Sequence, residues 1–193
     1  CFIGKYKSHN YNSINLTFKK ELLKVHKSDR RDMTKKPEPG ELELLNNTTI
    51  VLPQDYDDVI MTAARDFEDY LSAQGFPDSY KDSMKLTGCV SLQKNQNGVN
   101  IILSVNKDIQ EASGYMGYKI TVGDSDITLE GYDNRGIAQG LYFLEDLMNI
   151  RRAPFLKKQT IKRKALFSPR VSQSPMGMFE YNDAALSHMA HMG

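Results

Sequence analysis

Two different spacings of apolar residues predict the elements of this chain. One apolar face repeats about every 3.6 residues, as in a helix, over three segments: 54–74, 134–149 and 181–192. Alternating or β-branched apolar residues, which are typical of strands, occupy six segments: 49–52, 89–92, 99–105, 118–122, 127–130 and 160–167. The predicted order is therefore strand, helix, several strands, helix, strand and a last helix.

The helix predicted over 54–74 has the most regular pattern. Its apolar face is formed by seven residues: Val59, Ile60, Ala63, Ala64, Phe67, Tyr70 and Leu71. Asp55, Asp57 and Asp58 lie in the expected first turn, where the helix dipole favours negative charge. Gly75 is well placed to end the helix, because glycine readily adopts the left-handed conformation of a C-terminal cap.

The segments 118–122 and 127–130 are joined by Gly123-Asp-Ser-Asp126, and they are predicted to form an antiparallel hairpin with one buried face. We therefore expect an α/β (α+β) fold, in which a mixed β-sheet carries two helices packed on one face. Gly136 and Gly140 lie one turn apart on the second helix. Each costs about 1 kcal/mol of helix stability relative to alanine, so something is expected to pack closely against the backbone there.

Residues 1–47 differ from the rest of the chain. The stretch from Lys27 to Gly40 is charged, has no apolar period and contains two prolines, which predicts a linker. Its cations are interleaved with acids and have no aromatic platform, which favours a solvated tail over a surface for an acidic partner. The folded body is expected to begin near Thr48.

The composition excludes several classes of protein. The chain has 193 residues and a formal charge of +1, from 25 Lys and Arg against 24 Asp and Glu. Nucleic-acid affinity comes mainly from uncompensated Lys and Arg, so a dedicated nucleic-acid binder is not expected. No stretch approaches the roughly 20 apolar residues that span a bilayer. The length suits one domain with a tail or two small domains, whereas a complete (β/α)8 barrel needs about 250 residues.

Cysteine positions bear on localisation. In bacterial lipoproteins the signal peptide is removed directly before a cysteine that then carries the lipid, and a polar tether follows Cys1 here. We therefore expect lipidation of Cys1 and export to the periplasm or cell surface; the alternative is that Cys1 is simply where a segment was cut. Cys89 suits a small buried residue on a strand. A disulfide between the two stays open, and two isolated cysteines form no metal site or redox motif.

No motif for catalysis, cofactor binding or metal binding is found. His188 and His191 are three residues apart on the last predicted helix but lack the glutamate and third ligand of a zinc-protease helix. They are expected to be ordinary surface or interface residues, and His9 and His26 fall in the polar tail. The carboxylates from 55 to 82 suit a solvated helix face and single out no pair for sugar hydrolysis. We therefore expect no catalytic residue, no cofactor and no metal in this chain.

Two further groups of residues have both a functional and a structural interpretation. Six basic residues gather near the last predicted strand: Lys157, Lys158, Lys162, Arg163, Lys164 and Arg170. They could bind an anionic partner, but pairing with the acidic first helix is the simpler expectation. Four tyrosines could stack on sugar rings: Tyr115, Tyr118, Tyr132 and Tyr142. Tyrosine is common in strands, so an ordinary place in the sheet is the simpler expectation for these.

The stretch from Tyr118 to Leu147 has a recognisable pattern. A strand, a tight turn and a second strand ending at Gly131 precede a helix that contains Gly136 and Gly140-Leu141. This resembles the small α/β domain that precedes the catalytic barrel in family 20 glycoside hydrolases (β-N-acetylhexosaminidases) and in related α-glucuronidase-like enzymes. The earlier Ile50-Val-Leu-Pro53 and its following helix match the start of that domain, and the resemblance covers 48–170.

The resemblance implies a domain organisation. It gives a polar tail over 1–47, a hexosaminidase-like α/β domain over 48–170 and the start of a following barrel domain over 171–193. The catalytic carboxylates of the family lie inside the barrel, so none is carried over to this chain. An arginine near the barrel entrance contacts the sugar in hexosaminidases, but the junction here departs from that pattern, and neither Arg163 nor Arg170 is assigned to this role.

The function implied by the resemblance is that of a non-catalytic N-terminal domain in a larger, exported bacterial carbohydrate-active enzyme. Its expected partner is the catalytic barrel of the same parent chain, with a glycan as a further ligand left open. The alternative is a standalone glycan- or protein-binding module of a surface lipoprotein. Contact with a membrane is expected only through lipidation of Cys1.

Overall fold

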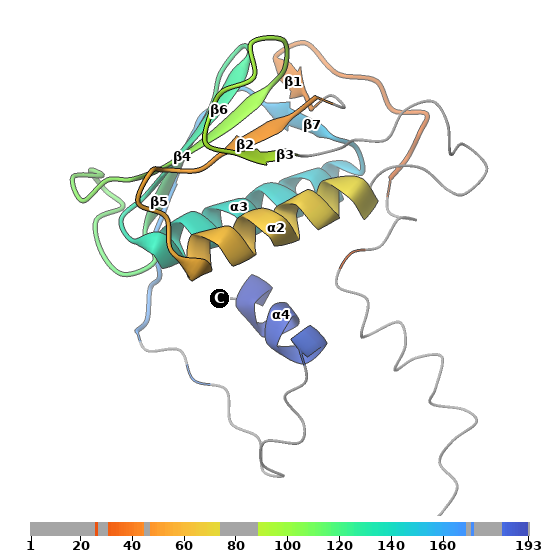
Figure 1. Ribbon diagram of the computed structural model, residues 1–193. Coiled ribbons are helices and arrows are strands. Elements are labelled where there is room, and N and C mark those ends of the chain that lie inside the picture. Colours follow the sequence, from red (N-terminus) through yellow and green to blue (C-terminus); the bar gives the residue numbers. More distant parts are fainter. Residues whose placement is uncertain are drawn as a thin grey trace, which may run out of the picture.

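A six-stranded mixed sheet forms the body of the domain (Figure 1). The computed structural model describes His26, 31–44, 47–73, 89–168, Val171 and 183–192. The six strands are β2 (Thr49–Val51), β3 (Cys89–Ser91), β4 (Asn100–Val105), β5 (Tyr118–Val122), β6 (Asp126–Gly131) and β8 (Thr160–Arg163). Their order in the sheet is β3-β2-β4-β6-β5-β8. β2 pairs in parallel with β3 and β4, and β4 with β6, whereas β5 is antiparallel to both β6 and β8.

The predicted hairpin is confirmed. Tyr118 pairs with Gly131 and Val122 with Ile127. The turn is closed by the amide of Gly123, which donates to the carbonyl of Asp126 at 2.9 Å. Alternate residues of both strands are buried, so one face of the hairpin faces the core as the alternation predicts.

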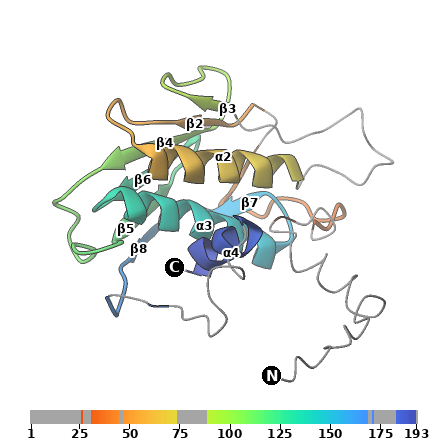
Figure 2. The ribbon, with the colours of Figure 1, turned by 60° about the horizontal axis from the view of Figure 1, so that its bottom comes forward.

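Two long helices, α2 (Asp58–Ala73) and α3 (Asn134–Arg151), pack side by side on one face of the sheet (Figure 2). Their apolar faces and the sheet enclose the core, in which Phe67, Leu141 and Leu129 are fully buried. This arrangement confirms the mixed α/β fold expected from the sequence. Within the described part of the chain, no helix combines the length and the apolar character needed to cross a membrane.

The ends of the two long helices are set by their capping residues and not by the repeat of apolar residues. α2 begins at Asp58, four residues later than predicted, because the Asp57 carboxylate accepts from the amide of Ile60 at 3.0 Å and caps the helix there. α3 is capped in the same way by Asp133 and extends to Arg151, where Arg152 adopts a left-handed conformation. The predicted stop at Gly75 lies outside the described residues.

A second, two-stranded sheet was not predicted. β1 (Glu41–Glu43) and β7 (Phe155–Lys157) pair antiparallel, with Leu42 opposite Leu156. Both leucines are buried, although the sequence placed 41–43 in the polar tail. A single apolar residue between two glutamates gives no measurable period, which is why this strand was missed. The strand predicted over 160–167 ends at Arg163.

The last helix, α4 (Asp183–Met192), lies on the side of α2 and α3 that faces away from the sheet (Figures 1 and 2). The carbonyl of Ala190 accepts a hydrogen bond from the Gln139 side chain of α3 at 2.8 Å. No residue of α4 is fully buried. The helical layer is therefore enclosed by the sheet on one side and partly covered by α4 on the other.

Candidate functional site

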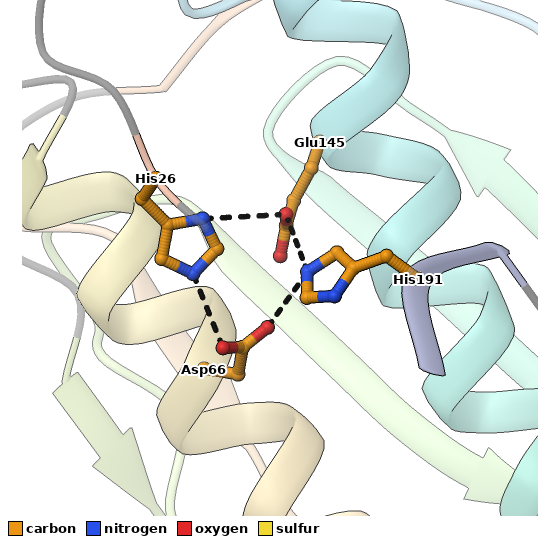
Figure 3. Close-up of side chains that lie close together, drawn as sticks. All are labelled: His26, Asp66, Glu145 and His191. Atoms are coloured by element: carbon orange, nitrogen blue, oxygen red, sulfur yellow. Dashed lines mark hydrogen bonds and ion pairs between the residues drawn. The ribbon is translucent and has the colours of Figure 1, made fainter. Parts of the chain in front are cut away.

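Four titratable side chains from four separate segments meet at the outer side of the helical layer (Figure 3). His26 precedes the domain, Asp66 lies on α2, Glu145 on α3 and His191 on α4. One nitrogen or oxygen atom from each lies within 4.8 Å of the others. We call these four residues the His/carboxylate cluster.

Each imidazole lies between the two carboxylates. His26 Nε2 is 3.1 Å from Asp66 Oδ1, and His26 Nδ1 is 3.8 Å from Glu145 Oε2. His191 Nε2 is 2.9 Å from Asp66 Oδ2 and 3.2 Å from Glu145 Oε2. The cluster is therefore a closed ring in which imidazole and carboxylate groups alternate.

The helical period explains why the side chain of Glu145 is buried. Leu141, Glu145 and Met148 are separated by four and three residues, so they share the buried face of α3. Glu145 is only 2% exposed. Burying a carboxylate is costly unless charged or hydrogen-bonding partners compensate, and the two histidines are the partners that the structure supplies.

Two tyrosines form the walls of the cluster. The ring of Tyr142 lies against His191 with centroids 4.1 Å apart, and the ring of Tyr70 meets His26 edge-on at 5.5 Å. The Tyr70 hydroxyl lies 3.3 Å from the carbonyl oxygen of Glu145 and 3.2 Å from Asn149 Oδ1. These contacts fix the rings and limit the access of water, which strengthens electrostatic interactions within the cluster.

The charges of the cluster shift one another's pKa values. Burial opposes the ionisation of Asp66, but hydrogen bonds from His191 and His26 outweigh it and hold the pKa of Asp66 far below its usual range. Burial raises the pKa of Glu145. Burial also disfavours the charged form of His191, yet Asp66 and Glu145 overcome this and raise the pKa of His191 to about 10. Two carboxylates at this site thus favour a positive charge between them.

Asp66 Oδ2 is buried against the His191 ring, 2.9 Å from Nε2, whereas Glu145 Oε1 is buried without a hydrogen bond. Glu145 Oε1 points into the space between the two imidazole rings (Figure 3). Because both carboxylates and both imidazoles can donate electron pairs to a cation, these four residues could hold a metal ion.

The sequence did not predict this cluster. The sequence pattern places His26 in a polar tail, His191 beside His188 on a surface helix, and Asp66 on a solvated helix face. The structure instead brings His26, Asp66 and His191 together around Glu145. One signal was available in the sequence, since a glutamate on the apolar face of a helix calls for a buried partner.

The other candidate residues are scattered. Tyr118 and Tyr142 are buried, while Arg135 lies over the ring of Tyr115 and Lys107 over that of Tyr132. The four therefore form no common surface for a sugar.

The prediction that the basic residues pair with the first helix was wrong for those with described partners. Lys158 contacts Asp124 at 2.8 Å and Lys162 contacts Glu111 at 3.2 Å, both outside α2. Lys162 lies on β8 at the edge of the sheet and Lys158 lies between β7 and β8, and both contact acids of loops instead of acids of α2. Arg163 lies over the ring of Phe143 at 4.1 Å.

Two open cavities are lined by described residues. One of about 310 Å³ lies beside β8, between Arg163 and Phe167, and one of about 430 Å³ lies beside the first turns of α2 and α3. Neither is lined by the His/carboxylate cluster.

Some residues singled out in the sequence lie outside the described part of the chain: Cys1, His9, Arg170 and the side chain of Cys89. Lipidation of Cys1 therefore stays a prediction.

Comparison with known proteins identifies the class of domain. Residues 34–162 match the family described as glycosyl hydrolase family 20, domain 2. This match covers more than half of the chain, which therefore belongs to this family, a non-catalytic domain of glycoside hydrolases. The resemblance found in the sequence is confirmed. A search of the curated proteins found no match.

Several solved structures are similar to this chain. They include the β-hexosaminidase of Streptomyces plicatus at 15% identity and a TM-score of 0.47, covering 68% of this chain and 25% of that protein. The family 20 β-N-acetylhexosaminidase of Streptomyces coelicolor has 17% identity and a TM-score of 0.42, with coverages of 73% and 27%. The chitobiase of Flavobacterium johnsoniae has 18% identity and a TM-score of 0.44, with coverages of 66% and 19%. The chain thus spans at most 27% of the length of these three proteins.

Proposed function

We propose that this chain is the supporting, non-catalytic domain of a larger glycoside hydrolase and packs against a catalytic barrel that follows it in the same protein. The observation that carries this proposal is the family match over 34–162, which includes both long helices and the six-stranded sheet except for Arg163, the last residue of β8. The role of such a domain is to stabilise its neighbour and to position it.

The segment that leaves the sheet supports this proposal. Leu166, Phe167 and Val171 follow β8 and are 86%, 76% and 81% exposed. Large apolar side chains that are this exposed and this close in sequence are typical of a surface that another domain covers. Burying each would contribute roughly 1.5–3 kcal/mol, which is enough to hold two linked domains in a defined orientation.

The cavity beside β8 supports the same interpretation. Leu166 and Phe167 form one side of it, and Tyr118 and Gln139 of the domain body form the other. Its volume of about 310 Å³ would accept several side chains of a neighbouring domain. We therefore propose that the barrel contacts the domain at this side, next to the point where the chain leaves the sheet.

The first test is to sequence the gene beyond the codon for Gly193 and to express the longer protein. We expect the added sequence to encode a barrel that hydrolyses aryl N-acetyl-β-hexosaminides, and the 193-residue chain to have no such activity. Removal of residues 1–168 from the longer protein should lower its melting temperature and soluble yield. Turnover by the 193-residue chain itself, or a following sequence without a barrel, would contradict the proposal.

A pair of matched variants tests the contact surface. Leu166→Ser should lower the melting temperature of the longer protein by several degrees but leave that of the 193-residue chain unchanged. Leu92→Ser is the control, because Leu92 is also exposed but follows β3, at the opposite edge of the sheet. Equal effects of both substitutions in the longer protein would show that the barrel does not contact this side.

A further inference from the structure

We propose that the His/carboxylate cluster binds one divalent transition-metal ion of the Zn²⁺ type. One nitrogen each of His26 and His191 and one oxygen each of Asp66 and Glu145 would be the ligands. The site would be structural, since all four positions are taken by protein and none is left for a substrate.

The four donor groups lie close enough together to be drawn around one tetrahedral ion. Zinc lies about 2.0–2.2 Å from nitrogen and oxygen ligands, so neighbouring ligand atoms of a tetrahedral site are about 3.3–3.6 Å apart. With one nitrogen or oxygen atom taken from each of the four residues, these atoms all lie within 4.8 Å of one another. Side-chain rotations that shorten the longest separation by about 1 Å would therefore bring the donors to the required positions.

The charges and donor types also fit. The carboxylates of Asp66 and Glu145 would balance the two positive charges of the ion, and neutral imidazoles would add none. Two nitrogen and two oxygen donors suit Zn²⁺ and its neighbours in the first transition series, whereas Ca²⁺ and Mg²⁺ require oxygen ligands and higher coordination numbers.

The contacts around the cluster orient its donors. His191 Nδ1 lies 2.8 Å from the carbonyl of Ser187 and donates to it, so in the neutral ring the free electron pair is on Nε2, which faces Asp66 and Glu145. In a metal-binding histidine, the ring nitrogen that does not bind the metal usually donates a hydrogen bond, often to a backbone carbonyl.

Glu145 gives an independent indication of a ligand. Its side chain is almost fully buried, yet its Oε1 atom has no hydrogen-bond partner and points between the two imidazole rings (Figure 3). A buried oxygen without a partner is costly. An ion at the centre of the cluster would contact this carboxylate directly and remove that cost.

Such an ion would join residues from four segments of the chain. His26 and His191 come from outside the family match over 34–162, whereas Asp66 and Glu145 lie within it. The ion would therefore fasten both the preceding segment and α4 to the outer side of α2 and α3.

The test uses the full 193-residue chain, stripped of metal with a chelator and titrated with ZnCl₂ in a calorimeter. We expect one Zn²⁺ per chain, and substitution by Co²⁺ should give the intense visible absorption of a four-coordinate ion. Glu145→Gln and His191→Gln should each weaken binding at least about tenfold. His188→Gln is the matched control on the same helix and should bind like the wild type.

Two results would overturn the proposal. If the wild-type chain binds no Zn²⁺ at one equivalent, or if His191→Gln binds as tightly as His188→Gln, the cluster is a network of ion pairs with protonated histidines and no metal. Should Glu145→Gln fail to fold, His26→Gln replaces it, because His26 lies outside the sheet and the long helices. Circular dichroism in the presence of chelator identifies any variant that is unfolded.

Discussion

Gly140 of α3 lies directly against Leu129 of β6, so close that a Cβ atom at Gly140 would be 2.2 Å from Leu129 Cδ1. One turn earlier, a Cβ at Gly136 would be 2.1 Å from the carbonyl oxygen of Gly117. The sequence predicted that something packs against both glycines, and this prediction is confirmed. The two contacts differ in kind, since one neighbour is a side chain and the other is backbone.

Gly136→Ala is expected to lower the free energy of unfolding by about 1–3 kcal/mol, because the Gly117 backbone cannot move aside without distorting the loop before β5. Gly140→Ala should cost less, since the Leu129 side chain can change rotamer and alanine favours the helix by about 1 kcal/mol. Urea denaturation would measure both. Ile150→Ala, at an exposed position of α3, serves as the control, and a Gly136→Ala protein as stable as the wild type would contradict this reasoning.

Asp133 joins the start of α3 to the loop before β5. Its Oδ1 atom accepts from the amide of Gly136 at 2.7 Å, and its Oδ2 atom accepts from the amide of Met116 at 3.1 Å. Asp133→Ala should therefore destabilise the domain by about 1–2 kcal/mol. Asp133→Asn retains one acceptor oxygen and should lose less, so equal thermal shifts for the two variants would argue against a capping role.

The pair Lys119–Glu130 links β5 to β6 and gives the stability a defined pH dependence. Hydrogen bonds from Lys119 at 2.7 Å and Asn106 at 2.8 Å lower the pKa of Glu130. The folded state thus binds this proton more weakly than the unfolded state, whose pKa is about 4.3. The pair stabilises the fold above that pH, and its contribution is lost as the pH falls through the folded pKa.

Glu130→Gln tests this dependence. Above about pH 5 the variant should be less stable than the wild type by about 0.2–1 kcal/mol, as for other cross-strand charge pairs. Below the folded pKa of Glu130 the two proteins should become equally stable. Denaturant titrations at a series of pH values would show the difference closing, whereas a constant difference would assign the effect to packing.

Tyr70→Phe tests the connection between the two long helices. The Tyr70 hydroxyl is buried and bonds the Glu145 carbonyl and the Asn149 side chain of α3. Its removal should cost about 1 kcal/mol, measured by thermal unfolding. Tyr56→Phe, at a partly exposed tyrosine that precedes α2, should leave the stability unchanged, and a similar loss in both variants would refute a specific role for Tyr70.

Elements with a long apolar pattern were predictable from the sequence. The hairpin of β5 and β6 and the helices α2 and α3 each repeat their pattern several times, so local spacing determines them. The pairing of β1 with β7 was not predictable, because each strand has only three residues and the pair depends on contacts between distant parts of the chain. Arg151 adds such a contact by donating to both carboxylate oxygens of Glu41.

The His/carboxylate cluster lies beyond local prediction for the same reason. Its members come from four segments, and only the packing of α4 and of His26 onto the helical layer brings them together. Metal-binding motifs are recognised in a sequence when their ligands lie close together, as His188 and His191 do, whereas the four residues of this cluster lie far apart in the chain. Among the four residues of the cluster, only Glu145 interrupts its local sequence pattern, because it is a charged residue on the apolar face of α3.

Among the strands that the structure describes, β8 is the last of the sheet, and one row of its backbone donors and acceptors faces no described strand. Lys162 and Arg163 lie on this strand, and Lys164 follows it directly. An open edge can recruit a strand from another copy, and positive charges along it oppose that approach. The charged side chains of this edge strand therefore disfavour edge-to-edge pairing between two copies of the domain.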